Sequence, residues 1–187
     1  SCVGVKEVLV NTHHRAADVE NWLGRWPGSL EIHTRFESEL LGSAGTVFAN
    51  RQFVEGERLF WIIYADNLTN INLQRMLETH AASETPLTLA VYETDEPERC
   101  GIVEIDSNGR VLSFEEKPQR PKSRWANSGI YLCGPAIFEV LDGACFDFGF
   151  DVLPKLTGRM SAYRMSEYIL DIGSIANYRR AQLEWEK

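Results

Sequence analysis

Residues 59–67, which read Leu-Phe-Trp-Ile-Ile-Tyr-Ala-Asp-Asn, give the clearest indication of the fold class. The first six residues are apolar on both faces, a pattern typical of a central parallel strand that is covered on each side. The run ends at Asp66, and ligands of open α/β sheets bind just beyond the carboxyl ends of the strands. From its position alone, Asp66 is as consistent with a cap on the next turn as with a functional carboxylate.

Outward from this strand, the apolar periodicity alternates between strands and helices. The predicted strands are 5–10, 30–36 and 87–92, and the predicted helices are 16–23, 46–53 and 72–83. Strands that alternate with helices in this way predict an α/β fold with a mixed, mainly parallel sheet flanked by helices.

The second half of the chain changes character. The Asn108-Gly109 pair supplies the positive φ angles of a tight turn and predicts a hairpin between residues 101–105 and 111–114. After it we predict strands at 128–133, 160–165 and 168–171 and helices at 135–141 and from Ser174 to about residue 186. Because no repeat or linker interrupts these segments, residues 1–187 are expected to form a single domain.

Composition restricts the partners and the compartment. The chain of 187 residues carries 19 Lys and Arg against 27 Asp and Glu, a formal net charge of −8, which argues against a nucleic-acid groove or a polybasic membrane patch. No apolar run approaches the roughly 18 residues that span a membrane. The four cysteines are widely spaced without a C-x-x-C pair and therefore favour free thiols in a reducing cytoplasm, and no histidine has zinc-ligand spacing. A phosphorylated small molecule stays compatible with the acidic surface if a metal ion or a lysine supplies positive charge.

The segment Gly42-Ser43-Ala44-Gly45 leads into a predicted helix. Two glycines separated by small residues let the backbone approach a flat ligand or an anion at a helix N-terminus. A plain loop that enters a helix has the same pattern, so this segment is a weak indication by itself.

Three further polar positions lie at predicted strand ends. Pro118 is expected to hold Lys117 extended, so that Glu116 and Lys117 project at a fixed spacing and could bind a sugar hydroxyl and a phosphate. Asn127 belongs to a polar turn before a strand. Asp171 follows a short strand, and two aspartates at strand ends could share one Mg²⁺. Each has an alternative: Glu116 and Lys117 could be a solvated charged strand end, Asn127 part of a simple turn, and Asp171 a local helix cap.

Six motifs follow one another along the chain: Leu41-Gly42-Ser43-Ala44-Gly45, Tyr64-Ala65-Asp66, Gly101-Ile102-Val103, Phe114-Glu115-Glu116-Lys117-Pro118, Asn127-Ser128-Gly129-Ile130-Tyr131 and Asp171-Ile172-Gly173-Ser174. Their order resembles that of the sugar-1-phosphate nucleotidyltransferases, which make nucleotide sugars from an NTP and a sugar 1-phosphate. The resemblance covers essentially the whole chain and implies a Rossmann-like, GT-A-like fold. The first motif looks most like the guanylyltransferases that act on mannose 1-phosphate or heptose 1-phosphate, which implies GTP as the nucleotide.

The resemblance also implies residue roles. Asp66 and Asp171 would hold the catalytic Mg²⁺, and with Lys117 they would form the catalytic set. Glu116 would bind sugar hydroxyls and Lys117 the sugar phosphate. Gly101 and Asn127 would line the sugar pocket. The residues that would face the nucleobase and ribose are Gly42, Ser43, Ala44 and Gly45.

One departure from the family concerns the start of the chain. Family members begin with a strand and a glycine-rich loop that cradles the triphosphate, and this chain opens where a typical member is past its first helices. We therefore expect a domain without its first strand and nucleotide loop. Strands 5–10 and 59–64 are then expected to pair with each other or to keep open edges, and open edges favour a homo-oligomer. A non-catalytic module that binds a sugar phosphate or nucleotide sugar is the alternative function.

Overall fold

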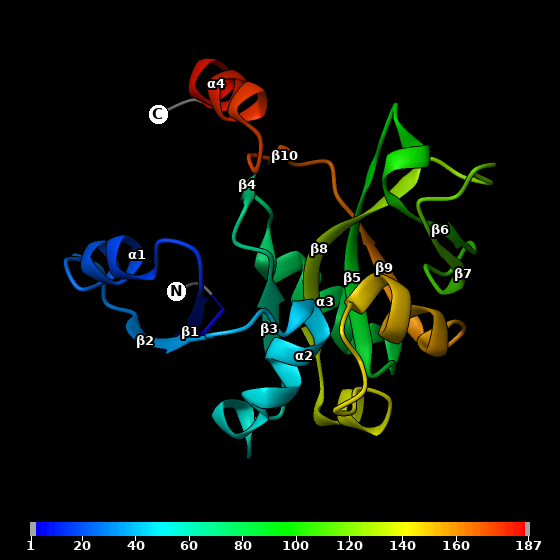
Figure 1. Ribbon diagram of the computed structural model, residues 1–187. Coiled ribbons are helices and arrows are strands. Elements are labelled where there is room, and N and C mark those ends of the chain that lie inside the picture. The colour runs from blue at the N-terminus through cyan, green and yellow to red at the C-terminus, as the bar shows by residue number, and fades with distance from the viewer. Residues whose placement is uncertain (1–2, 186–187) are drawn as a thin grey trace.

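The computed structural model describes residues 3–185 (Figure 1). Its strands are β1 (Glu7–Thr12), β2 (Glu31–Phe36), β3 (Phe60–Ile63), β4 (Asn67–Thr69), β5 (Leu87–Glu93), β6 (Gly101–Ile105), β7 (Val111–Glu116), β8 (Trp125–Cys133), β9 (Met160–Arg164) and β10 (Ile169–Asp171). Its α-helices are α1 (Ala16–Leu23), α2 (Gly42–Ala49), α3 (Leu73–Ser83) and α4 (Ile175–Glu184). Short 3₁₀ turns at Arg51–Val54, Pro97–Arg99, Pro135–Glu139 and Leu153–Leu156 and a π turn at Phe148–Val152 join them.

A six-stranded mixed sheet with β8 at its centre forms the body of the protein. β8 pairs along its whole length with β5, and on the opposite edge with β6 and then β3. The α/β class with a mixed sheet is confirmed. Most pairs are antiparallel, however, and within this sheet of the described chain only β5 and β9 run parallel, so the expected mainly parallel pairing is wrong.

The strand at residues 59–64 is not the central parallel strand that its apolar run predicts. β3 lies antiparallel to β8 and has no second strand partner among residues 3–185. Phe60 packs into one core cluster and Trp61 into the other, so both faces are covered as expected. The apolar pattern reports this two-sided cover, which says nothing about the direction or number of the neighbouring strands.

The two faces of the sheet carry two separate cores. Successive side chains of a strand point to opposite faces, so Tyr131 of β8 lies in one cluster and Leu132 in the other. α2 adds Ala44 to the Tyr131 side, and α3 adds Met76 to the Leu132 side. The two helices therefore cover opposite faces of the sheet.

Two small sheets stand beside this body. β1 and β2 form a parallel pair, and with α1 they lie to one side of the large sheet in Figure 1. β10 pairs antiparallel with β4 and leads into α4 at the top of the view. Within residues 3–185 β1 does not pair with β3, so the expected open edges are found instead of mutual pairing. The homo-oligomer stays a prediction.

Local signals in the sequence match the structure closely. β6 and β7 form the expected hairpin, and Gly109 in its turn has a φ of 83°. Ser174 caps α4 by accepting a hydrogen bond from the backbone N–H of Asn177. The helix expected at 46–53 begins earlier, at Gly42, and the segment that starts at Pro135 is a 3₁₀ turn. Residue 186, where the last helix was expected to end, lies outside the described residues.

Cys100, Cys133 and Cys145 are free thiols, and Cys2 lies outside the described residues. In the described part of the chain, every helix is too short or too polar to cross a lipid bilayer.

Candidate active site

Asp66 and Asp171 come together although 104 residues separate them in the chain. Asp66 lies in the turn between β3 and β4, and Asp171 ends β10, which pairs with β4. The backbone N–H of Ile172 donates to the carbonyl of Asp66 at 2.8 Å. Both carboxylates border Gly173: a Cβ on residue 173 would lie 3.0 Å from Asp171 Oδ1 and 3.3 Å from Asp66 Oδ2. The two strand ends thus place two carboxylates around one glycine.

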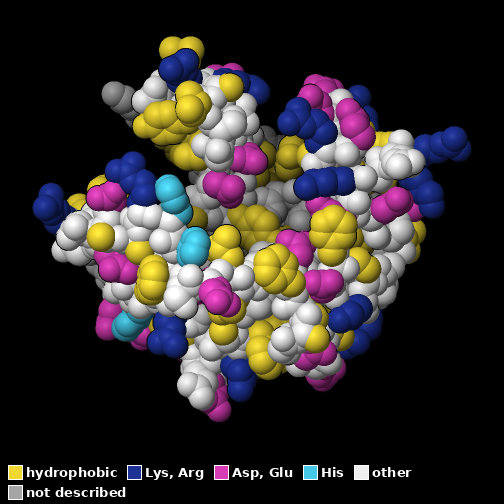
Figure 2. All heavy atoms as spheres, viewed as in Figure 1, with side chains coloured by type: hydrophobic (Ala, Val, Ile, Leu, Met, Phe, Trp, Pro, Cys, Tyr) yellow, Lys and Arg dark blue, Asp and Glu magenta, His cyan; other side chains and the backbone are white. Residues whose placement is uncertain are grey.

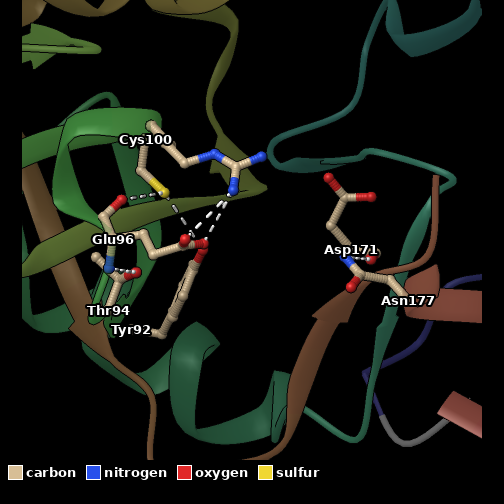
Figure 3. Close-up of polar contacts among 7 residues, drawn as sticks. Tyr92, Thr94, Glu96, Cys100, Asp171 and Asn177 are labelled. Atoms are coloured by element: carbon tan, nitrogen blue, oxygen red, sulfur yellow. Dashed lines mark hydrogen bonds and ion pairs between the residues drawn. The ribbon is translucent and has the colours of Figure 1, made fainter. Parts of the chain in front are cut away.

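The start of α4 holds Asp171 in place. Its Oδ1 accepts a hydrogen bond from the backbone N–H of Gly173 at 2.7 Å, and its carbonyl accepts one from Asn177 Nδ2 at 2.8 Å. Figure 3 shows Asp171 and Asn177 on one side of the view, with Tyr92 and Cys100 facing them from the other. Asp171 is therefore fixed at a helix N-terminus, where a negative charge is favourable.

Electrostatic strain marks the carboxylate pair. The pKa of the Asp66 carboxyl is raised, first because the surrounding chain removes part of its hydration and then because the charge of Asp171 is near. Burial is also the main cause of the raised pKa of Tyr92, to which the charge of Asp171 adds. A pair of carboxylates that repel each other is a natural place for a cation.

A divalent ion fits this pair only with outside ligands. Among residues 3–185 no group of three or more His, Cys, Asp or Glu side chains is arranged to hold a metal. Mg²⁺ is commonly held by one or two carboxylates, with phosphate oxygens and waters completing the octahedron. Asp66 and Asp171 therefore offer oxygen ligands of the kind that Mg²⁺ takes, and do not form a closed metal cage.

A second group of polar side chains surrounds Glu116 at the end of β7. Glu116 is paired in register with Gly101 at the start of β6. A Cβ on residue 101 would lie 2.6 Å from Glu116 Oε2 and 2.7 Å from the ring of Phe114, so glycine is needed for this close approach. Desolvation by burial raises the pKa of Glu116, the charge of Lys117 opposes this shift, and that of Asp147 adds to it.

Two tyrosines and an amide form the wall next to Glu116. The hydroxyl of Tyr131, a fully buried residue, accepts a hydrogen bond from Asn127 Nδ2 at 2.7 Å. The hydroxyl of Tyr64 interacts with those of Ser43 and Tyr131, and its pKa is raised chiefly by burial. The predicted pocket residues Gly101, Glu116 and Asn127 thus belong to one connected region.

Asp147 belongs to this region and was missed by the sequence analysis. Its Oδ2 accepts a hydrogen bond from Ser43 Oγ at 3.1 Å, and its Oδ1 accepts one from the backbone N–H of Phe150 at 3.0 Å. The second bond makes Asp147 the cap of the π turn at Phe148–Val152. In the sequence Asp147 is an aspartate before a turn, and the ordinary capping role of such an aspartate gives no reason to assign it to a binding site.

Lys117 departs from its expected conformation. Its φ is +49°, in the left-handed region, so the expectation that Pro118 holds it extended is wrong. Proline favours extended backbone for the residue before it, and Lys117 adopts the left-handed conformation instead. The backbone N–H of Lys117 donates to the carbonyl of Cys100 at 3.0 Å, and the residue is exposed.

The glycine segment forms the first turn of α2 and is held from two sides. Gly42 has a φ of 75°, and the backbone N–H of Ala44 donates to the carbonyl of Phe146 at 3.0 Å. From the other side, the buried carboxylate of Glu37 accepts a hydrogen bond from Thr46 Oγ1 at 2.6 Å. Ala44 is fully buried in the core, which leaves Gly42, Ser43 and Gly45 as the partly exposed members of the expected nucleotide-binding set.

The β3–β4 turn connects the two groups. Tyr64 belongs to the Glu116 region and Asp66 to the carboxylate pair, and Asn67 Nδ2 fastens the turn to β8 by donating to the carbonyl of Ser128 at 2.6 Å. Figure 2 shows that this face of the molecule is hollowed between the α4 end and the β6–β7 end, with acidic side chains along the edges. The β3–β4 turn therefore joins the carboxylate pair to the Glu116 region.

Residues 1–187 match the protein family described as "Nucleotidyl transferase". The chain is 31% identical over 184 residues to D-glycero-alpha-D-manno-heptose 1-phosphate guanylyltransferase from Aneurinibacillus thermoaerophilus, with 97% of this chain and 79% of that protein covered. It is 30% identical over 214 residues to glucose-1-phosphate adenylyltransferase from Thermotoga maritima, with 98% of this chain and 51% of that protein covered. The chain therefore spans about half the length of the adenylyltransferases that it matches.

Among solved structures, the crystal structure of HddC from Yersinia pseudotuberculosis superposes with a TM-score of 0.81 at 25% sequence identity. The match covers 98% of this chain and 80% of HddC. The same protein complexed with GMP-PN gives a TM-score of 0.80 at 26% identity. The likeness thus extends over almost the whole chain in both sequence and structure.

Proposed function

Because the chain belongs to the nucleotidyl transferase family, we propose that it transfers a nucleotidyl group from an NTP to a sugar 1-phosphate and releases pyrophosphate. The observation that carries this proposal is the convergence of Asp66 and Asp171 around Gly173. The β3–β4 turn joins these carboxylates to the Glu116 region, as a reaction between two phosphorylated substrates requires.

The carboxylate pair has the metal-binding role in this proposal. Asp66 and Asp171 would hold a Mg²⁺, which neutralises charge on the phosphates when it is bound. Asp171 is kept rigid by its bonds to Gly173 and Asn177, and Asp66 by the backbone bond between its carbonyl and Ile172. The pKa of Asp66 is raised by desolvation and then by the charge of Asp171, and a bound cation would oppose both causes.

The Glu116 region has the sugar-binding role. Glu116 would accept hydrogen bonds from sugar hydroxyls, Gly101 and Asn127 would line the pocket, and Lys117 would bind the sugar phosphate. A phosphate oxygen of the sugar phosphate would attack the α-phosphorus in line. That oxygen is already ionised at neutral pH, so no side chain has to remove a proton, and catalysis rests on positioning and charge neutralisation.

We further propose GTP as the nucleotide, facing Gly42, Ser43 and Gly45. Support comes from the likeness of residues 41–45 to the guanylyltransferase branch, from the 31% identity to a heptose 1-phosphate guanylyltransferase and from the neighbour that binds GMP-PN. The adenylyltransferase relatives make ATP the necessary competitor in any assay.

The direct test is pyrophosphate release by the chain with Mg²⁺ and each pairing of GTP or ATP with mannose, heptose or glucose 1-phosphate. We expect turnover with GTP, and loss of turnover in Asp66→Asn and Asp171→Asn. The matched control is Asp142→Asn, an exposed carboxylate that accepts a hydrogen bond from its own loop. Stabilisation by GDP-mannose or a sugar phosphate without any turnover would contradict the proposal and favour a binding module.

A further inference from the structure

The carboxylate of Asp147 is held rigidly against the glycine segment. One oxygen accepts from Ser43 Oγ and the other from the backbone N–H of Phe150, at 3.1 and 3.0 Å. Ser43 Oγ in turn accepts a hydrogen bond from the backbone N–H of Phe148 at 2.9 Å. Because each of these groups holds the next, the carboxylate has a fixed position at the entrance of the π turn.

The Asp147 carboxylate lies close to the carboxylate of Glu116. A Cβ on residue 149 would lie 2.5 Å from Glu116 Oε2 and 3.2 Å from Asp147 Oδ1, so Gly149 leaves the space in which the two carboxylates meet. In the described chain no side-chain or backbone donor hydrogen-bonds to the half-buried carboxylate of Glu116. Glu116 is therefore an acceptor without a donor, beside a second carboxylate that keeps lone pairs free.

We propose that Asp147 is a specificity-determining residue that, together with Glu116, selects a neutral sugar 1-phosphate with adjacent hydroxyls. This inference rests on the proposed function. Ionised carboxylates only accept hydrogen bonds, and hydroxyl groups can supply the missing donors. A sugar that carries its own carboxylate would place a third negative charge beside Asp147 and Glu116, so its binding is disfavoured.

The test compares a neutral hexose 1-phosphate with the corresponding uronic acid 1-phosphate, in the wild type and in Asp147→Asn. The amide keeps the shape of the side chain and still accepts from Phe150, so the turn is preserved. We expect the wild type to prefer the neutral sugar by roughly 30-fold or more in kcat/KM. In Asp147→Asn, KM for the neutral sugar should rise about 10-fold with kcat changed less than about 2-fold, and the preference should fall about 10-fold.

Two further variants keep the inference falsifiable. Asp142→Asn removes the same charge from an exposed neighbouring loop and should leave the preference unchanged. Asp147→Ser retains a capping oxygen for the π turn without the charge, and serves if Asp147→Asn does not fold. An unchanged preference in the folded variant overturns the inference, as does an equal loss for both sugars.

Failure of the proposed function is distinguishable from failure of the inference. If the wild type turns over neither sugar, the proposed function fails, and calorimetric affinities of the two sugar phosphates replace kcat/KM. A neutral-sugar preference that falls in Asp147→Asn then still supports the role of Asp147. Equal affinities of the wild type for both sugars would overturn it.

Discussion

The Glu116 region and the carboxylate pair of Asp66 and Asp171 are built in different ways. The Glu116 region rests on the six-stranded sheet, and its Tyr131 is fully buried between core side chains. The carboxylate pair rests on the three-residue strands β4 and β10 and the start of α4, where both aspartates are exposed. Substitutions in the Glu116 region should therefore disturb folding together with binding, whereas substitutions of the two aspartates should affect function and leave the fold intact.

The largest effect is expected for a buried ring in the Glu116 region. Tyr131→Ala removes a fully buried ring that stacks on Phe148 with centroids 5.1 Å apart, and should lower the free energy of unfolding by about 4 kcal/mol. Tyr178→Ala is the matched change on α4, where the side chain is 52% exposed, and should cost less than about 0.5 kcal/mol. Urea unfolding measures both, and equal losses would contradict the distinction between the two regions.

Next in size is the loss of a functional carboxylate. Asp171→Asn should reduce turnover by about 100-fold, which corresponds to roughly 2.7 kcal/mol of transition-state stabilisation. Its melting temperature should stay close to that of the wild type, because the residue is exposed. Asp18→Asn on α1 is the control for surface charge, and its turnover should not change. Steady-state pyrophosphate release measures the loss of turnover, and thermal melts show whether the fold of Asp171→Asn is intact.

A smaller effect on both stability and binding is expected at the pocket glycine. Gly101→Ala forces a methyl group against Glu116 Oε2 and the Phe114 ring and should cost about 1–3 kcal/mol of stability. It should also raise KM for the sugar phosphate, because Glu116 must move. Gly134→Ala is the matched control, since the nearest atom to its added Cβ is 3.8 Å away. A harmless Gly101→Ala would show that the pocket tolerates displacement of Glu116.

The smallest expected effect is the contribution of the Asp66 carboxyl to stability and its dependence on pH. The pKa of Asp66 is raised in the folded state, so the native protein binds this proton more tightly than the unfolded chain does. The associated stability is present below the ordinary carboxyl pKa and is lost as pH rises through the raised pKa. Without divalent ions, Asp66→Asn should therefore be more stable than the wild type at pH 7, by less than about 1 kcal/mol because the group is exposed.

That advantage should disappear as pH falls below about 4, where the wild-type carboxyl is protonated in both states. Thermal melts of the two proteins across this pH range test it. A wild type that is more stable than Asp66→Asn at pH 7 would show that the carboxylate is stabilised, not strained, in the folded protein.

Local signals explain why much of the fold was predictable. Turn chemistry at Gly109 and the cap at Ser174 act within a few residues, and each specifies its own structure. The order of motifs likewise identified Asp66 and Asp171 as candidates, and the structure places Asp66 just after β3 and Asp171 at the end of β10. What periodicity could not supply was the partner of each strand. β3 is apolar on both faces for the expected reason, yet it lies antiparallel to β8.

The candidate site shows the same division. Glu116 was found because it belongs to a recognisable motif, whereas Asp147 was missed because its sequence neighbours suggest only a capped turn. Its place beside Glu116 depends on Gly149 and on the contact with Ser43, which is 104 residues away in the chain. Long-range contacts of this kind leave no periodic trace in a sequence.

The α/β class, most of the elements and the family with its ordered motifs could be predicted from the sequence, because these depend on short-range chemistry and on the order of residues. The tertiary structure alone decided the strand directions, the left-handed Lys117 and the meeting of Asp66 with Asp171 and of Glu116 with Asp147. These features arise only when the strands pair and segments distant in the chain come within hydrogen-bonding distance.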